Sequence, residues 1–176
     1  MTMRYPLIIT ALVSAATVVG VVAWRTATVA AQQGSATANM QVSANVLRKC
    51  WITALPLDFG AYDPVQANVT APLDGQATLT VACTKGTSVN IGLDNGTNAQ
   101  GQTRRMTAGG TNLLNYELYK DGGRSQRWGD TGGERFDAGL APSKDPRNFI
   151  VYGRVPGGQD VPEGNFQDTI LVTVQF

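Results

Sequence analysis

The chain has 176 residues and a formal net charge of +1, so no strong electrostatic field directs it to nucleic acid or to anionic lipid. It contains no histidine, which excludes the Ser-His-Asp and Cys-His nucleophile arrangements and the commonest zinc and copper ligand. Its 20 glycines and its low content of charged residues, 15%, are typical of an all-β protein with many turns.

The N-terminal segment, residues 1–31, has the pattern of an export signal. Arg4 supplies a short positive region, and residues 6–24 are almost entirely apolar. Small residues follow at 28–31, which predicts cleavage before Gln32. The apolar run is also long enough for an uncleaved membrane anchor. The small-residue site directly after it favours a signal peptide.

The first stretch of the predicted mature chain alternates strictly between apolar and polar residues. The apolar positions are Ala36, Ala38, Met40, Val42, Ala44 and Val46. Successive side chains of a strand point to opposite faces, so residues 36–46 predict a strand with one dry face. Such a strand on a free chain end can pair with its own domain, as the first strand of an ordinary sandwich, or with another molecule.

The next segment predicts a turn and then a hairpin. Leu57 and Phe59 alternate as strand residues do, and Gly60 with Asp63-Pro64 signals a turn. Strands are expected at 77–83 and 88–93, joined by a turn at 84–86.

The two cysteines, Cys50 and Cys83, both flank strand patterns. In an exported protein a single pair of cysteines predicts one disulfide. The alternative is two free, buried thiols in a cytosolic protein, which the export signal disfavours.

The remainder of the chain predicts three further strands separated by irregular segments. The strands are expected at 112–120, 148–155 and 168–176, with irregular segments around 94–110 and 128–130. No part of the mature chain has helical periodicity. Short strands between frequent turns predict a β-sandwich in a single domain.

Several polar and aromatic residues could be considered for chemistry, and each has a simpler structural interpretation. Scattered acids in a turn-rich sandwich are usually solvated or form turns; they are Asp58, Asp63, Asp74, Asp94 and Glu117. The two glycosylation-like motifs, 68–70 and 95–97, are expected in turns, and Arg104 and Arg105 are expected to be a solvated loop pair rather than a partner-binding pair. Trp128 is expected to pack in the core or a loop. We therefore expect no catalytic residue, metal or cofactor.

A series of fragments runs through nearly the whole mature chain. In order they are Cys50, L-D-F-G-A-Y-D (57–63), V-A-C-T-K-G (81–86), R-R-M (104–106), L-N-Y-E-L-Y-K-D (114–121), W-G-D (128–130), V-Y-G-R-V-P-G-G-Q (151–159) and G-N-F-Q-D-T-I-L-V-T-V-Q-F (164–176). Together they resemble the spore coat protein U domain family, which includes the pilin subunits of archaic chaperone-usher pili. Trp51 and Phe166 depart from the residues that the family commonly has.

The resemblance implies an incomplete immunoglobulin-like β-sandwich whose missing strand is donated by another molecule. A periplasmic pilus chaperone would lend that strand first. At the outer-membrane usher, the N-terminal segment of an identical or related pilin subunit would then replace it. Residues 32–45 would be the donor strand and residues 46–176 the pilin domain. The subunit contacts would come from Ala36, Ala38, Met40, Val42 and Ala44.

On this basis the chain is expected to be a non-enzymatic subunit of a surface fimbria that serves attachment and biofilm formation. Two alternatives are a spore coat or extracellular matrix protein that polymerises by the same exchange, and a monomeric secreted binding module with a complete sandwich.

Overall fold

The fold is described by a computed structural model that covers residues 33–176. Within this range the chain forms eight strands and one short 3-10 turn. The elements are β1 (Cys50–Ala54), β2 (Leu73–Cys83), β3 (Ser88–Leu93), β4 (Arg104–Thr107), β5 (Leu113–Tyr119), η1 (Gly132–Glu134), β6 (Phe136–Leu140), β7 (Arg147–Val155) and β8 (Val172–Gln175).

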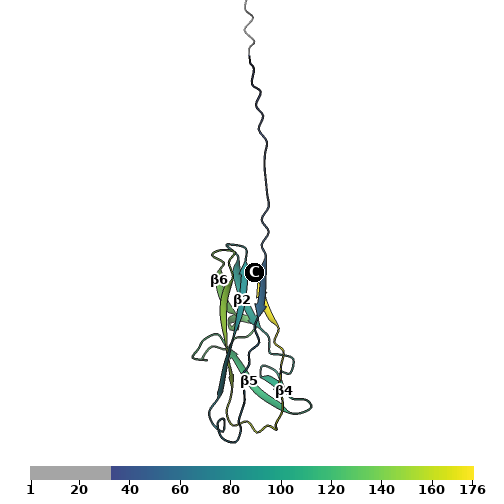
Figure 1. Cartoon of the computed structure of the whole chain (residues 1–176), viewed down its shortest axis with the longest axis vertical. Coiled ribbons are helices and arrows are strands. Elements are labelled where there is room, and N and C mark those ends of the chain that lie inside the picture. The colour runs from purple at the N-terminus through teal and green to yellow at the C-terminus, as the bar shows by residue number, and fades with distance from the viewer. Residues whose placement is uncertain (1–32) are drawn as a thin grey trace, which may run out of the picture. The chain divides into compact units, whose positions relative to one another are not determined.

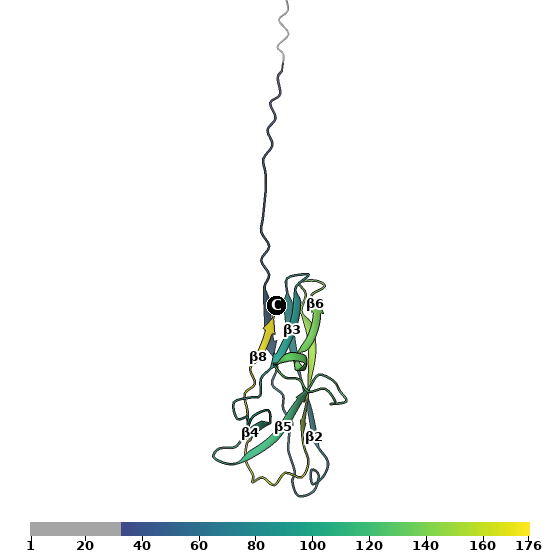
Figure 2. The same ribbon diagram turned by 180° about the vertical axis from the view of Figure 1, so that it is seen from behind.

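The strands form two antiparallel sheets. One has five strands in the order β1-β2-β7-β5-β4, and the other has three in the order β6-β3-β8. Figure 1 labels β2, β4 and β5 of the first sheet and β6 of the second. Figure 2 shows β8 beside β3, which it pairs through Asn90–Gln175 and Leu93–Val172. The predicted all-β sandwich is therefore confirmed.

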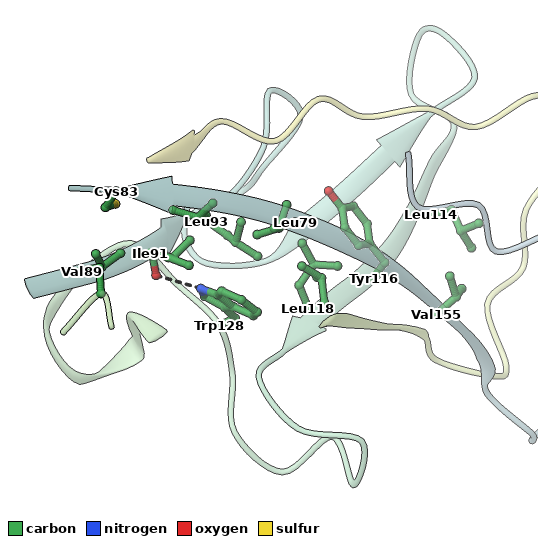
Figure 3. Close-up of a cluster of buried hydrophobic side chains, with 13 residues drawn as sticks. Leu79, Cys83, Val89, Ile91, Leu93, Leu114, Tyr116, Leu118, Trp128 and Val155 are labelled. Carbon is green, nitrogen blue, oxygen red and sulfur yellow. Dashed lines mark hydrogen bonds between the residues drawn. The ribbon is translucent and has the colours of Figure 1, made fainter. Parts of the chain in front are cut away.

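Alternating apolar residues of both sheets form the core between them. Leu79 and Val81 of β2 in one sheet, and Val89 and Ile91 of β3 in the other, are all buried. Figure 3 shows the core side chains, which include Leu93, Leu114, Tyr116, Leu118 and Val155. Burial of these side chains is the main stabilising term of the fold.

Trp128 is fully buried in this core. Its indole N–H donates a hydrogen bond of 2.9 Å to the carbonyl of Ile91 (Figure 3), and its ring stacks on Phe136 at 5.0 Å between centroids. The bond satisfies the only polar atom of the side chain, as a buried tryptophan requires. The expected packing role of Trp128 is confirmed.

The prediction that Arg104 and Arg105 are a solvated pair is wrong for Arg104. Its side chain is fully buried and pairs with Glu117, which also pairs with Arg127. Glu117 is thus a structural partner of two arginines rather than a solvated acid. Arg104 and Glu117 lie on the paired strands β4 and β5. The sequence of β4 is too short and too polar to predict that Arg104 is buried.

The ends of several strands differ from the expected ranges. β2 begins at Leu73 rather than at residue 77, β4 lies within 94–110, which is expected to be irregular, and no strand is expected where β6 lies. Only Val172–Gln175 of the predicted last strand joins a ladder with β3. The preceding residues, 168–171, lie beside the loop that follows β3.

Residues 33–49 form no strand, although alternation predicted one over 36–46. Their side chains are exposed, and the first strand of the structure, β1, begins at Cys50. Alternation alone does not make a strand, because the backbone also needs a neighbouring strand to bond with. No helix within residues 33–176 is long and apolar enough to cross a membrane, and the predicted signal at 1–31 lies outside the described residues.

Candidate strand-accepting groove

A groove opens the core of the sandwich along one side. One wall is the segment 54–62, which follows β1, and the other is the segment 161–172, which precedes and enters β8. Two cavities of about 670 and 760 Å³ lie between these walls. Both are lined by Leu57, Asp58, Phe59, Met106, Phe166 and Gln167. Because they share these residues, the two cavities adjoin one another, and together they are called the groove here.

The floor of the groove is the hydrophobic core itself. Its first part is lined by Ala77, Leu79, Leu93, Tyr116, Leu118 and Val151, and its second part by Leu73, Leu114, Val155 and Val161. These residues come from both sheets. Apolar side chains in the walls pack on the core but stay partly exposed, among them Leu57, Phe59 and Ile170. The sandwich therefore has an apolar core that its own described strands do not close.

The first wall is held in place by two glycines of the large sheet. Gly75 of β2 and Gly153 of β7 are direct partners in the ladder. A Cβ atom at Gly153 would lie 2.7 Å from the Phe59 ring and 2.9 Å from Leu57, and one at Gly75 would lie 3.0 Å from Phe59. The missing side chains make the space in which Leu57 and Phe59 lie.

The second wall bonds to the rest of the domain through alternate residues. Gln167 exchanges two backbone hydrogen bonds of 2.9 Å with Thr107. The carbonyl of Thr169 accepts from Thr97, and that of Leu171 accepts from Asp94, both at 3.1 Å. Within residues 33–176 no hydrogen bond involves the backbone N–H or C=O of the residues between them, Phe166, Asp168 and Ile170.

These free backbone groups leave the second wall able to pair with a further strand. Adjacent residues of an extended chain direct their backbone groups to opposite edges, so those of Phe166, Asp168 and Ile170 face away from the loop at 94–107. That opposite edge borders the groove. A bare edge beside an apolar groove is suited to β-augmentation, in which a strand bonds through its backbone and fills pockets with alternate side chains.

One polar pair lies inside the groove. The Tyr116 hydroxyl donates a 2.7 Å hydrogen bond to Asp168 Oδ2. Asp168 Oδ1 accepts from Asn98 Nδ2 at 2.9 Å and from the Asn98 backbone N–H at 3.2 Å. Burial, with Asp168 as the second cause, raises the pKa of Tyr116 far above its usual value, so this hydroxyl remains a donor at all physiological pH values.

The groove carries no arrangement of residues that suggests metal chemistry. In the part of the chain that the structure describes, no group of three or more His, Cys, Asp or Glu side chains could hold a metal ion. The arrangement suits the binding of an extended apolar segment.

Of the predicted site residues, the two cysteines are paired and the five proposed donor residues are exposed. Cys50 and Cys83 are joined in a disulfide that links β1 to β2, which confirms the predicted pairing. The proposed donor residues are all exposed, with Met40 at 84% and Val42 at 82%. The structure pairs none of the five with a strand, so their role as a donor stays a prediction.

The other acids and both glycosylation-like motifs have structural roles. Asp63 accepts from the backbone of residues 65–67, which lowers the pKa of its carboxyl, and Asp58 accepts from Gly60. Asn68 is buried and donates to the carbonyl of Ala71, while Asn95 donates to that of Gly101. The predicted turn roles of Asp58, Asp63 and Asn68 are confirmed, whereas Asn95 lies in the loop just before the turn at 97–98.

Sequence reasoning did not identify the groove-lining residues individually. They come from segments that are distant in the chain, so no local motif marks them. Two sequence features point to the groove walls: the L-D-F-G segment, 57–60, and the alternation of 166–174. The alternation predicts an apolar face, but it does not show that this face lacks a partner strand.

Comparison with known proteins identifies related chains. The model of the Spore Coat Protein U domain family matches residues 36–173. "Protein U" of Myxococcus xanthus is 39% identical over 160 residues, covering 83% of this chain and 88% of that protein. Among solved structures, the chain is similar to one in the CsuC–CsuE chaperone–tip adhesion subunit pre-assembly complex from the archaic chaperone-usher Csu pili of Acinetobacter baumannii. The TM-score is 0.55 and the identity 26%, over 74% of this chain and 40% of the matched chain.

Proposed function

The chain belongs to the spore coat protein U domain family, and from this membership we propose that it is a structural, non-enzymatic subunit of a surface fimbria. Subunits join by donor-strand exchange, in which residues 36–44 of one subunit fill the groove of the next. The fimbria serves attachment and biofilm formation.

The observation that carries this proposal is the open groove with its bare acceptor edge. The groove needs an extended strand with small and medium apolar side chains on one face. Residues 36–44 offer such a face, since Ala36, Ala38, Met40, Val42 and Ala44 alternate with polar residues. The segment also has as many residues as the wall 54–62, so its extended length suits the groove.

The same groove defines the partners of the subunit before and during assembly. The exposed core of a free subunit would aggregate, so a periplasmic pilus chaperone covers it after export. An outer-membrane usher then exchanges the chaperone for the donor segment of an identical or related subunit. The solved relative is itself part of a chaperone–subunit complex, which supports the chaperone as the first of these partners. The polymer lies on the cell surface, and residues 1–31 are the export signal.

A second candidate is a coat or extracellular matrix polymer built by the same exchange. It is favoured by the family description and by the likeness to Protein U. A monomeric module with a complete sandwich is disfavoured, because no strand within residues 33–176 closes the groove.

The test is a charge placed on the dry face of the donor segment. Met40→Asp would bring an unpaired carboxylate into an apolar groove, at a cost of about 3 kcal/mol or more per contact. The variant should still form its disulfide and bind the chaperone, but it should give no surface polymer. Gln41→Asp, on the wet face, is the matched control and should assemble normally.

The two ways in which Met40→Asp can fail have different meanings. Normal polymer from this variant would show that residues 36–44 are not the donor. Loss of the folded monomer would show that the segment belongs to the sandwich of its own chain. Surface polymer is measured by electron microscopy and by immunoblotting of sheared cell-surface material.

A further inference from the structure

The Tyr116–Asp168 pair has a place in the groove that packing alone does not explain. The core-directed residues from the second wall into β8 are Phe166, Asp168, Ile170, Val172 and Val174, and only one of them is charged. A carboxylate at such a position is costly unless hydrogen bonds compensate it. Here three donors do so, from Tyr116 and Asn98.

The pair connects the two sheets across the groove. Tyr116 belongs to β5 of the large sheet, whereas Asp168 precedes β8 of the small sheet. The Tyr116 ring also contacts Phe59 of the first wall edge-on, with 6.1 Å between ring centroids. Tyr116 is thus a groove-floor residue that touches both walls, one by aromatic contact and the other by a hydrogen bond.

The surroundings of Asp168 are shaped to hold its carboxylate. A Cβ atom at Gly96 would lie 2.0 Å from Asp168 Oδ2, so this loop position accommodates only glycine without displacing the acid. The next residue, Thr97, bonds to the carbonyl of Thr169, and Asn98 bonds to Asp168. The loop and Tyr116 therefore fix the side chain of Asp168 from both sides, while its backbone groups stay free toward the groove.

We propose that the Tyr116–Asp168 hydrogen bond positions the wall 166–172 so that its free backbone edge can accept a donor strand. This inference rests on the proposed function. Tyr116 and Asp168 are positioning residues, since they act by holding the acceptor edge at a fixed distance from the first wall. Without the bond, the wall keeps its outward contacts to the loop at 94–107 and its apolar packing on the core, but it loses its hydrogen bond to the floor of the groove.

The test removes one hydroxyl group. Tyr116→Phe keeps the ring against Phe59 and deletes only the hydrogen bond to Asp168. The matched control is Tyr119→Phe on the same strand, because the Tyr119 hydroxyl makes no hydrogen bond within residues 33–176. Both changes are made in the mature, disulfide-bonded chain carrying Met40→Asp, which prevents self-assembly under the proposed function.

Two quantities are measured on each variant. Hydrogen–deuterium exchange reports the opening of 94–98 and 166–172, with the amides of β2 and β7 as the reference for global stability. Fluorescence anisotropy reports the affinity for a labelled synthetic peptide with the sequence of residues 35–46. Loss of a hydrogen bond to a carboxylate predicts about ten- to hundredfold faster exchange in the two segments, and a similar loss of peptide affinity. The protection of β2 and β7 should be unchanged.

The results separate the positioning role from the proposed function. Three results of Tyr116→Phe would each overturn the positioning role. The exchange rate at 166–172 could be unchanged, or exchange could become faster by the same factor throughout the domain. Exchange could also become faster in the wall while the peptide affinity stays the same. If the peptide does not bind even the parent chain, donor-strand exchange by residues 36–44 is wrong, and the exchange data alone then decide whether the hydrogen bond holds the wall.

Discussion

Arg104 shows how much of this fold depends on one buried cation. Its guanidinium donates to the carbonyls of Leu93, Asp94 and Trp128 at 2.6–2.9 Å and pairs with Glu117. Burial lowers the pKa of Arg104, and the attraction of Glu117 opposes this shift, so the group stays charged. The side chain ties the end of β3 to β4, β5 and the segment at 128–130.

Replacing Arg104 by Leu should destabilise the domain by about 3–5 kcal/mol, because it leaves three buried carbonyls without a donor and removes one partner of Glu117. Its neighbour Arg105 bonds only to Asn98 and Gln100, near the surface. Arg105→Leu should therefore cost about 1 kcal/mol or less. Urea unfolding of the two variants gives the comparison, and equal losses would contradict the central role of Arg104.

The pair of Asp74 and Arg154 should make stability depend on pH in the acid range. Arg154 hydrogen bonds to both carboxylate oxygens, at 2.7 and 2.9 Å, and holds the pKa of Asp74 below its usual value. A carboxyl with a lower pKa in the folded state stabilises the fold above its unfolded pKa of about 4, and this contribution is lost as pH falls through the folded value.

Asp74→Asn should therefore lower the free energy of unfolding at pH 7 and leave it unchanged at a pH below the folded pKa of Asp74. The loss at pH 7 should be about 1 kcal/mol or less, because the pair is more than one-third exposed and solvent screens it. Denaturant titrations at several pH values measure the difference. A deficit that stays constant down to pH 2 would mean that the effect of the substitution is not electrostatic.

At the scale of elements, the groove depends on how the segment after β1 packs on the large sheet. Leu57 and Phe59 lie over the paired glycines Gly75 and Gly153, and Leu55 bonds back to Thr78 at 3.0 Å. This wall therefore has its own anchor and is not simply a continuation of β1. Its position determines the width of the groove.

A methyl group at Gly153 should displace this wall. Gly153→Ala would place a Cβ atom 2.7 Å from Phe59, which should destabilise the domain by about 1–3 kcal/mol and reduce chaperone binding and polymer yield. Gly122→Ala is the control, because its Cβ atom would lie 3.5 Å from Tyr152, an ordinary contact. Thermal unfolding and polymer yield are measured for both. Normal assembly of Gly153→Ala would show that this wall does not define the groove.

Period-two alternation was sufficient to predict β2, β3, β5, β7 and β8, because each buries one face. β6 was not predicted: it has only five residues and contains Gly139 at φ +64°, and the ladder with β3 changes register there. Arg104 was misjudged because charged residues are rarely buried, and only the surrounding carbonyls explain its place. The alternation of 36–46 predicts an apolar face but does not identify what that face contacts.

At the scale of the whole domain, the two sheets leave one long side of the core open. The groove begins at the end of β1 and the start of β8, where Ala54 and Val172 line it, and no strand within residues 33–176 lies between the segments 54–62 and 161–172. The family resemblance implied a missing strand, and the groove is where a donated strand would fit. Under the proposed donor-strand exchange, the segment 36–44 and the groove belong to one chain, so identical subunits would join head to tail without a limit on length.

The most direct test of donor-strand exchange is photo-crosslinking from position 40 in assembled polymer. Met40 is replaced by p-benzoylphenylalanine, and polymer is grown from equal amounts of ¹⁵N-labelled and unlabelled subunits. Mass spectrometry should find position 40 joined to residues 54–62 or 161–172, in peptide pairs of which about half are isotopically mixed. Crosslinks that occur only in pairs of one isotopic composition, or that fall outside the groove, would contradict donation between subunits.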